Sequence, residues 1–409
     1  MTHGRLVLLS ATLFLAYADR AVSVAVAAPL KAQFGLSDAA LGLLNGAALV
    51  IPFALAALLL GAARWQVRTG RAMAASVVVW TLAAVGFAFA QSYGQLVVGR
   101  MLMGVGQAAL FPAAVAALGA SSASGRLSLL TAASATGRSG GLLAVGALLY
   151  LAASSAAAIL PVAPWRVAAV LMLVPNLLVA WLLWRMDSGP PVVTGTRQGS
   201  RAAIDHMRSR ASAYVPFIAA ASSILIIVQS AGAWIPSILV RSAGMSPAQA
   251  ATAAGLIVLL GAPIGHLGAG RLVRAVPAPT LLVIASVCAV AASAVIAFAD
   301  NAVVLLIGLT LLVMAGGGGA AAAMVGLQPL APVPLRPAAT AIYLGTATLV
   351  GYAFGPFATG VLSDAMAGQA RGLALALLGV VAFAGSLCVL SALGGHRSWR
   401  EVVRSESVE

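Results

Sequence analysis

The sequence predicts an all-α membrane protein built from about twelve transmembrane helices. Composition is the first reason: of the 409 residues, 62% are hydrophobic and only 8% are charged, whereas a soluble domain has about 25% charged residues. The second reason is that apolar residues form continuous runs of about twenty, the length of a helix that crosses a bilayer. A β-barrel would instead show short alternating segments.

The apolar runs define the expected helices in chain order. Six of them precede a long polar stretch, at residues 5–30, 39–62, 72–91, 95–119, 127–152 and 165–186. Six follow it, at 213–240, 247–270, 277–299, 302–328, 337–362 and 370–394. The polar stretch contains "SGPPVVTGTRQGSR", a composition typical of a flexible linker. We therefore expect four parts: an N-terminal six-helix half at 1–186, a cytoplasmic linker at 187–212, a C-terminal six-helix half at 213–394 and a cytoplasmic tail at 395–409.

A weak internal repeat relates the two halves. "FGLSDAALGLLNGA" precedes the second expected helix and "AGMSPAQAATAAGL" precedes the eighth. Aligning Gly35 with Gly244 also aligns Gly61 with Gly270, so the register holds across a whole helix. Parallel six-helix repeats with a substrate site between them at mid-membrane are an architecture of secondary transporters. The repeat predicts two pseudo-symmetric halves and transport by alternating access.

The basic residues predict the orientation in the membrane. Of the 23 Lys and Arg residues, sixteen fall on one side of the expected helices, four on the other side and three within the helices. The positive-inside rule then places both termini and the linker in the cytoplasm. The net charge of +14 is thus explained by topology, and we expect a multi-pass protein of the cell membrane, inner or plasma, in contact with lipids and without a nucleic-acid partner.

Four charged residues lie away from the terminal turns of the expected helices. Asp19 and Arg20 are adjacent in "LAYADRAVSV", Arg100 is in the fourth helix and Arg138 in the fifth. Such residues cost several kcal/mol inside a bilayer and are functional by default. Together they carry a net charge of +2, which a substrate carboxylate or phosphate would balance, and an arginine binds either group through two parallel hydrogen bonds. We therefore predict Arg20, Arg100 and Arg138 as substrate-binding residues.

A structural alternative exists for each charge. Asp19 pairing with Arg20 or Arg100 would only pin helices together, although adjacent helical residues point about 100° apart, which favours a cross-helix partner for each. Arg100 lies near the end of its helix, where its side chain can instead extend to the interface.

Less specific candidates occupy the second half. Gln229, Tyr343, Thr346 and Tyr352 are expected to line the substrate cavity, with ordinary interhelical hydrogen bonding as the alternative. For His266, a hydrogen bond to a neighbouring backbone carbonyl is favoured over a proton-shuttling role.

At this point the residues resemble the major facilitator superfamily. "GAARWQVRTGR" (Gly61 to Arg71) occupies the place of that family's loop signature between the second and third helices, but Trp65 stands where the family has Asp. The resemblance implies roles in conformational gating for a set of residues in this loop and in its repeat: Gly61, Arg68, Arg71, Gly270 and Arg274. The missing Asp leaves open whether this loop locks the outward-facing state as it does in the family.

Within the superfamily the chain is most similar to the spinster-like branch, with the anion:cation symporter branch second. The matching pieces are "YADRAVSVAVAAPLKAQFGLSDAALGLLNG", "GRMLMGVGQAALFPAA", "WIPSILVRSAGMS" and "RPAATAIYLGTATLVGYAFGPFATGVLSD". Where these relatives have a Glu in the fourth helix that shares protonation with the Asp of the first, this chain has Gln107. The resemblance implies proton coupling through Asp19 and Arg20, with Gln107 at the position of the second acid. As an amide, Gln107 cannot exchange the proton itself, but it is also predicted as a substrate-binding residue.

These observations predict a secondary transporter of a small organic anion or an anionic amphiphile such as a lysolipid. Proton coupling through Asp19 is one version; an uncoupled facilitator or exchanger, and an efflux carrier of drugs or metabolites, are the alternatives. An enzyme is not expected, because no nucleophile, base or metal-ligand spacing lies within the helices. We also expect no cofactor, no metal and a monomer. A receptor built on a transporter fold is a further alternative. A channel is not expected, because twelve dissimilar helices lack the ring of equivalent residues that surrounds a channel pore.

Overall fold

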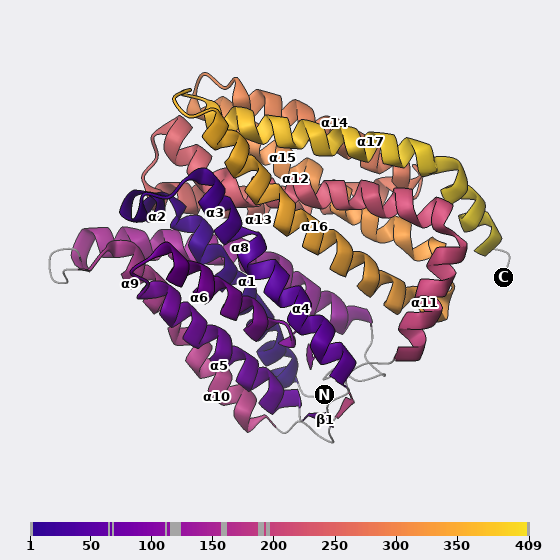
Figure 1. Cartoon of the computed structure of the whole chain (residues 1–409), viewed down its shortest axis with the longest axis horizontal. Helices are drawn as coiled ribbons and strands as arrows, with labels where there is room; N and C mark the ends of the chain where they lie inside the picture. Colours follow the sequence, from indigo (N-terminus) through magenta and orange to yellow (C-terminus); the bar gives the residue numbers. More distant parts are fainter. Residues whose placement is uncertain are drawn as a thin grey trace. The chain divides into compact units, whose positions relative to one another are not determined.

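The computed structural model describes residues 3–63, 66–67, 69–110, 113–114, 124–156, 162–186, 192–193 and 197–406. Nearly all of this part of the chain is helical (Figure 1). The exception is a short antiparallel pair of two-residue strands, β1 (Gln66–Val67) and β2 (Val192–Val193).

The helices up to residue 186 fall in the six expected spans of the first half. They are α1 (His3–Ala25), α2 (Ala27–Phe34), α3 (Asp38–Asn45), α4 (Ala47–Ala63), α5 (Thr69–Ala88), α6 (Tyr93–Gln107), α8 (Ser124–Leu151), α9 (Pro164–Leu171) and α10 (Val174–Arg185), with a π-helical turn at Ala152–Ala156. In the described residues, three expected spans contain two helices each: the first contains α1 and α2, the second α3 and α4, and the sixth α9 and α10. The break in the second span lies at Gly46, whose φ of −120° and ψ of −96° are not helical.

The remaining helices cover the second half. They are α11 (Arg197–Ser209), α12 (Ala211–Ala243), α13 (Pro247–Leu272), α14 (Ala278–Ala297), α15 (Ala302–Leu327), α16 (Arg336–Ala365) and α17 (Gly372–Glu406), with 3-10 turns at Gln328–Leu330 and Val333–Leu335. In the described residues, ten helical stretches are long and apolar enough to cross a membrane. The other two expected spans contain α6 and α8.

The expectation of a flexible linker is wrong over residues 197–209, which form α11. This segment lacks proline and is amphipathic, so it can turn one face to the protein. His206 holds it there, with its Nε2 3.0 Å from the carbonyl oxygen of Leu330. The expected tail is also ordered: α17 continues to residue 406, and Trp399 donates a hydrogen bond to the carbonyl of Gly326 (3.0 Å).

Contacts between Cα atoms divide the chain into two compact units. The first unit comprises residues 1–36, 47–195 and 239–259, and the second comprises 37–46, 196–238 and 260–409. This division does not follow the sequence halves, because α3 belongs to the second unit and α4 to the first. The functional halves at 1–186 and 213–394 stay a prediction.

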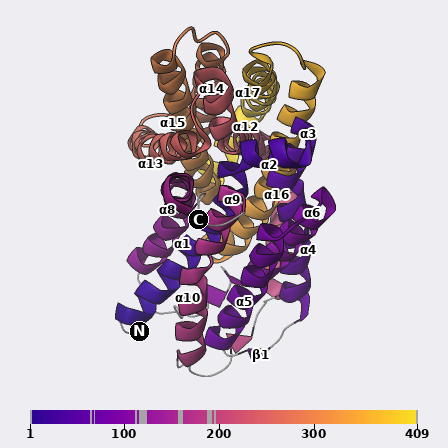
Figure 2. The ribbon, with the colours of Figure 1, turned by 90° about the vertical axis from the view of Figure 1, so that its left-hand side faces the viewer.

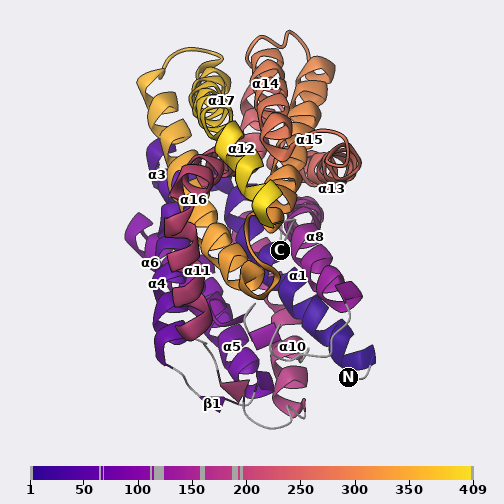
Figure 3. The same cartoon turned by 90° about the vertical axis from the view of Figure 1, so that its right-hand side faces the viewer.

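Each unit is a bundle with its own helix pairs. In the first, α1 packs against α8, and α5 packs against α6 and α10 (Figure 2). Its core contains large side chains that are almost completely buried, among them Leu13, Met73, Val77 and Trp80. In the second, α14 packs against α15 and α17, and α16 packs against α17 and α3 (Figure 3).

The contact of α3 with α16 is unusually polar at its end. The carboxylate of Asp364 accepts hydrogen bonds from the backbone N–H groups of Asp38 and Ala39, both at 2.8 Å. The hydroxyl of Ser363 donates to the carboxylate of Asp38 (2.6 Å). Free N–H groups and the helix dipole make a helix N-terminus favourable for an anion, so Asp364 caps α3 from another helix.

Small residues bring the two backbones together below this cap. A Cβ atom added at Gly42 would collide with the carbonyl oxygen of Pro356, and one added at Gly46 with that of Tyr352. A Cβ atom at Gly360 would collide with the carbonyl oxygen of Asp38. Glycine is required at these three positions because only hydrogen fits between the helices.

Candidate functional site

The carboxyl group of Asp19 is enclosed by three helices of the first unit. Asp19 lies on α1 and is 1% exposed. Its Oδ2 accepts hydrogen bonds from the indole Nε1 of Trp80 on α5 (3.0 Å) and from the amide Nδ2 of Asn176 on α10 (2.7 Å). In the described part of the chain, no cationic side chain forms an ion pair with it. We call Asp19, Trp80 and Asn176 the Asp19 site.

Local sequence explains why these partners meet. Trp80 is fully buried in the core of the first unit, and a buried indole N–H requires an acceptor. The helix is interrupted after α9, at Met172 and Leu173, and α10 begins at Val174. This places Asn176 in the first turn of α10, where its side chain is fully buried.

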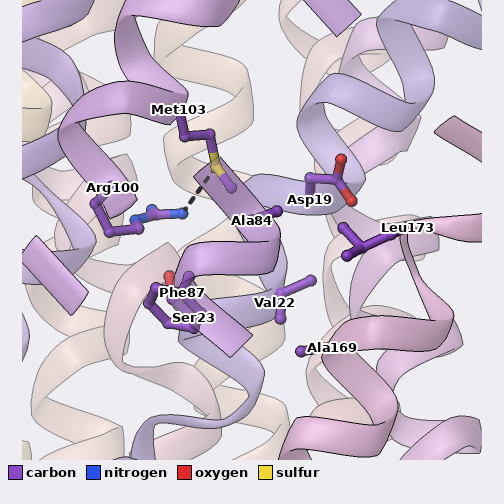
Figure 4. A pocket seen from close by; sticks show the side chains of 9 residues that line it. All are labelled: Asp19, Val22, Ser23, Ala84, Phe87, Arg100, Met103, Ala169 and Leu173. Carbon is purple, nitrogen blue, oxygen red and sulfur yellow. Dashed lines mark hydrogen bonds between the residues drawn. The ribbon is translucent and has the colours of Figure 1, made fainter. Parts of the chain in front are cut away.

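Two oxygen atoms of the Asp19 site lack a donor. Neither Oδ1 of Asp19 nor Oδ1 of Asn176 has a hydrogen-bond partner in the described residues, although both atoms are buried. Beside Asp19 lies a small cavity of about 10 Å³, whose lining includes Ser23, Phe87 and Arg100 (Figure 4). Unpaired buried acceptors are rare in folded proteins, which marks this carboxyl as unusual.

Arg20 points to a different set of partners. Its Nε donates to Oε1 of Gln107 on α6 (2.6 Å), and the amide of Gln107 in turn donates to the carbonyl of Ala16 (3.0 Å). The guanidinium carbon lies 4.7 Å from the ring centre of Tyr17 and 5.1 Å from that of Phe53. We call Arg20, Gln107, Tyr17 and Phe53 the Arg20 cluster. Asp19 and Arg20 thus have separate cross-helix partners, as expected from their adjacent positions.

The other two predicted arginines of this unit differ in exposure. Arg100 is 2% exposed, and its Nη1 lies 3.5 Å from Sδ of Met103. Figure 4 shows its side chain directed toward Met103, and its burial argues against the alternative in which it extends to the membrane interface. Arg138 is half-buried on α8, the helix that packs against α1.

The predicted cavity residues of the second half lie in the second unit. Tyr343 and Tyr352 of α16 and Gln229 of α12 are buried, whereas Thr346 of α16 is exposed. His266 bonds to the carbonyl of Ala262 in its own helix, with a distance of 2.7 Å from Nδ1. The favoured alternative for His266 is therefore confirmed.

The gating residues are only partly described. Arg68 lies outside the described residues, and Gly61 is in the last turn of α4. Arg71 is exposed at the start of α5, and its guanidinium lies 5.6 Å from the ring centre of Trp184. Gly270 is in the last turn of α13 and has open space around it, and Arg274 is exposed in the turn that follows the helix. Their gating role stays a prediction.

Sequence reasoning missed the partners of both charges. Trp80 reads as an ordinary core aromatic, and its contact with Asp19 spans 61 residues of chain. Asn176 carried a usable signal, since it is a lone amide in the apolar run "VPNLLVAW". Tyr17 carried another, because a residue three positions before Arg20 shares its helix face. Among the described residues, no group of three or more His, Cys, Asp or Glu side chains is placed to hold a metal ion.

Comparison with known proteins agrees with this architecture. The family model described as "Major Facilitator Superfamily" matches residues 8–356. An MFS-type efflux pump of Mycolicibacterium smegmatis (strain ATCC 700084 / mc(2)155) is 27% identical over 406 residues, covering 93% of this chain and 90% of that protein.

Two solved structures have a similar fold. A bacterial homolog of the human lysosomal transporter Spinster, inward-facing and occupied, has a TM-score of 0.75 at 19% identity, covering 98% of this chain and 96% of that one. A D-xylose-proton symporter has a TM-score of 0.74 at 17% identity, covering 95% of each chain. These matches confirm the expected fold class, a membrane protein of two six-helix halves, and identify a transporter and not an enzyme. The chain belongs to the major facilitator superfamily.

Proposed function

We propose that this transporter moves a small organic anion or an anionic amphiphile, such as a lysolipid, by alternating access. The observation that carries the proposal is the Arg20 cluster. The half-buried guanidinium of Arg20 lies against two aromatic rings and has no acidic partner among the described residues. A cation in apolar surroundings is costly without a counter-charge, and an anionic substrate supplies one.

The chemistry around Arg20 suits an anion with an apolar part. Gln107 engages the Nε atom, which leaves the two terminal nitrogens, the pair that forms parallel hydrogen bonds with a carboxylate or phosphate. The rings of Tyr17 and Phe53 offer apolar surface beside that charge. Arg100, Arg138, Gln229, Tyr343, Thr346 and Tyr352 are proposed as further substrate-binding residues.

We propose Asp19 as the proton carrier of the same cycle. Its carboxyl is buried, and its two hydrogen bonds in the described residues come from neutral donors, Trp80 and Asn176. Arg100 lines the cavity beside it but forms no ion pair with it there, and burial without a bonded counter-ion is unfavourable for a charge. A neutral, protonated Asp19 removes that cost. Gln107 stands where relatives carry a second acid, so Asp19 works as a single site; the alternative is an uncoupled facilitator or exchanger.

Ligand-induced thermal stabilisation of the purified protein tests the anion proposal. Arg20→Gln should weaken the binding of an anionic lysolipid by more than tenfold, about 1.4 kcal/mol, and Arg20→Lys should recover part of it because a lysine lacks the planar fork. Arg185→Gln is the matched control, since the exposed Arg185 also stacks on an aromatic ring, Trp181 (4.2 Å). Equal affinity in wild type and Arg20→Gln would contradict the proposal.

Efflux of a drug or metabolite is the second candidate. It is supported by the name of the mycobacterial relative, which is an efflux pump. The two candidates differ in the charge of the ligand. Stabilisation by cationic drugs and none by anions, with Arg20→Gln binding the drug more tightly, would favour this candidate.

We also propose a monomer in the cell membrane. Its proposed orientation, with both termini and residues 187–212 in the cytoplasm, rests on the distribution of basic residues. A single cysteine at Ser200 should not react with a membrane-impermeant thiol reagent in intact cells and should react after permeabilisation. Labelling in intact cells would contradict the proposed orientation and indicate the opposite one.

A further inference from the structure

The amide of Asn176 has a property that the other partner of Asp19 lacks. An indole N–H can only donate a hydrogen bond, whereas a side-chain amide can donate from its nitrogen or accept at its oxygen. Asn176 and Asp19 are 2.7 Å apart at Nδ2 and Oδ2. This distance suits an amide that donates to a carboxylate, and it equally suits an amide, turned about its last bond, that accepts from a carboxylic acid.

The unpaired oxygen of Asn176 fits a second arrangement, in which it gains a donor. As the amide stands, Oδ1 of Asn176 has no donor, and neither has Oδ1 of Asp19. With a proton on Oδ2 of Asp19 and the amide turned over, Oδ1 of Asn176 accepts that proton's hydrogen bond. Trp80 still donates to Oδ2 in both arrangements, so it holds the carboxyl in place while Asn176 changes.

The charged groups near the site leave this role to Asn176. Arg20, on the same helix as Asp19, is engaged by Gln107. Arg100 of α6 lines the small cavity beside Asp19, and α8 contributes the half-buried Arg138. The charged residues of α5 and α10, Arg71 and Arg185, lie at helix ends.

We infer that Asn176 is the positioning residue for the proton on Asp19, its amide donating to the carboxylate and, turned over, accepting from the acid. The inference deepens the proposed function, since it concerns the proton carrier assigned there. No proton passes to Asn176; only the orientation of its amide changes. Protonation of Asp19 therefore changes a hydrogen bond in the first turn of α10, beside the break between α9 and α10.

Infrared difference spectroscopy between alkaline and acidic pH tests this inference on the purified protein without any substrate. The acid C=O band of Asp19, identified by its loss in Asp19→Asn, should appear on acidification together with a change in one side-chain amide C=O band. Asn176→Leu should abolish the amide change and shift the acid band to higher frequency, because the acid loses its hydrogen-bond acceptor. An unchanged acid band in Asn176→Leu, an amide change that persists there, or no acid band at all would overturn the inference.

Two further variants keep the test decisive. Asn45→Leu is the matched control, since Asn45 is another buried asparagine (5% exposed), and the hydrogen bonds of Asp19 in the described residues come from Trp80 and Asn176; both bands should remain. If Asn176→Leu does not fold, the exchange variant Asp19→Asn with Asn176→Asp keeps an acid and an amide in contact, and the paired bands should return relative to Asp19→Asn. Their absence in the folded exchange variant contradicts the inference.

Transport measurements separate this inference from the proposed function. If uptake into vesicles ignores a proton gradient while the two bands still change together, the coupling proposal fails and the role of Asn176 stands. If uptake follows the gradient and is lost in Asp19→Asn, but the amide band does not change, only the inference about Asn176 fails.

Discussion

Gln107 keeps the charge of Arg20 available. The amide oxygen accepts a hydrogen bond from Nε of Arg20 at 2.6 Å and carries no charge of its own. A glutamate in this place, as in the relatives that the sequence resembles, would form a buried ion pair with the same nitrogen. Under the proposed transport of an anion, an amide at this position therefore leaves Arg20 as a cation that a ligand can neutralise, whereas an acid would neutralise it internally.

Gln107→Glu should weaken anion binding and add a pH dependence. At neutral pH the new carboxylate pairs with Arg20, and affinity for an anionic ligand should fall about tenfold, or 1.4 kcal/mol. As pH falls and the new carboxyl is protonated, affinity should recover toward that of the wild type. Thermal stabilisation measured across a pH series checks this.

A glutamine on the same helix serves as the control for this prediction. Gln95 is exposed near the start of α6, so Gln95→Glu should leave affinity unchanged at every pH. If Gln107→Glu binds anions as well as the wild type at neutral pH, then Arg20 does not carry the ligand's charge.

The sequence showed which charges lie within the apolar helices but not what they contact. Asp19, Arg20 and Arg100 stand out because ionisable residues are rare in apolar runs. Their partners come from other helices, and an apolar run does not reveal which of its faces meets which neighbour. Asn176 is 157 residues from Asp19 along the chain, so only the packing of α1 against α10 brings the two together.

At the scale of single elements, Arg166 holds the end of another helix. Its Nη1 and Nη2 donate to the carbonyl oxygens of Ala88 and Ala90, at 2.5 and 2.6 Å, where α5 ends. The last carbonyls of a helix have no partner within it, and a cation there also interacts well with the helix dipole. Arg166 therefore caps the C-terminal end of α5.

Arg166→Gln should destabilise the protein clearly. Two buried carbonyls lose charged donors, each worth about 1.5–3 kcal/mol, so the apparent melting temperature in detergent should fall by several degrees. Arg166→Lys should recover only part of the lost melting temperature, because a lysine lacks the planar guanidinium that donates to both carbonyl oxygens.

An exposed arginine provides the comparison for Arg166. Arg371 pairs with Asp300 at 2.9 Å, but both side chains are exposed, at 45% and 86%. Such a pair contributes about 0–1 kcal/mol, so Arg371→Gln should barely change the melting temperature. A fall as large as that of Arg166→Gln would refute the capping explanation.

Helix positions were predictable and helix breaks were not. Runs of about twenty apolar residues mark the spans because the bilayer sets their length. The break at Gly46 has no such signal, since glycine is common within membrane helices and a close backbone contact such as that of Gly42 with Pro356 is visible only after folding. The helix α11 was missed because its neighbours, rich in Gly and Pro, dominate the composition of the linker.

At the scale of the whole molecule, the contact of α3 with α16 links the second expected span to the eleventh. Alternating access requires contacts between the two sequence halves to form and break during each cycle. The polar cap of Asp364 on α3 and the glycine contacts below it are therefore expected to open in one stage of transport.

A reversible cross-link tests this expectation. The side chains of Asp38 and Ser363 meet at 2.6 Å, so Asp38→Cys combined with Ser363→Cys should form a disulfide on oxidation. Transport should stop in the oxidised protein and resume after reduction. The exposed Cys288 is first replaced by Ser to avoid side reactions.

The single-cysteine variants define the background for this experiment, because each removes one hydrogen bond without allowing the bridge. Both should transport equally before and after oxidation. Full transport by the cross-linked protein would mean that α3 and α16 stay together throughout the cycle.

The division into units has a consequence for how the chain can be cut. The polypeptide passes from one unit to the other after residues 36, 46, 195, 238 and 259, and only the crossing at 195 lies in the linker. A break there yields fragments 1–195 and 196–409, of which the first carries residues 37–46 of the second unit and the second carries residues 239–259 of the first. Neither fragment holds a complete unit, so we expect the two to be stable only when synthesised together and to purify as a non-covalent pair.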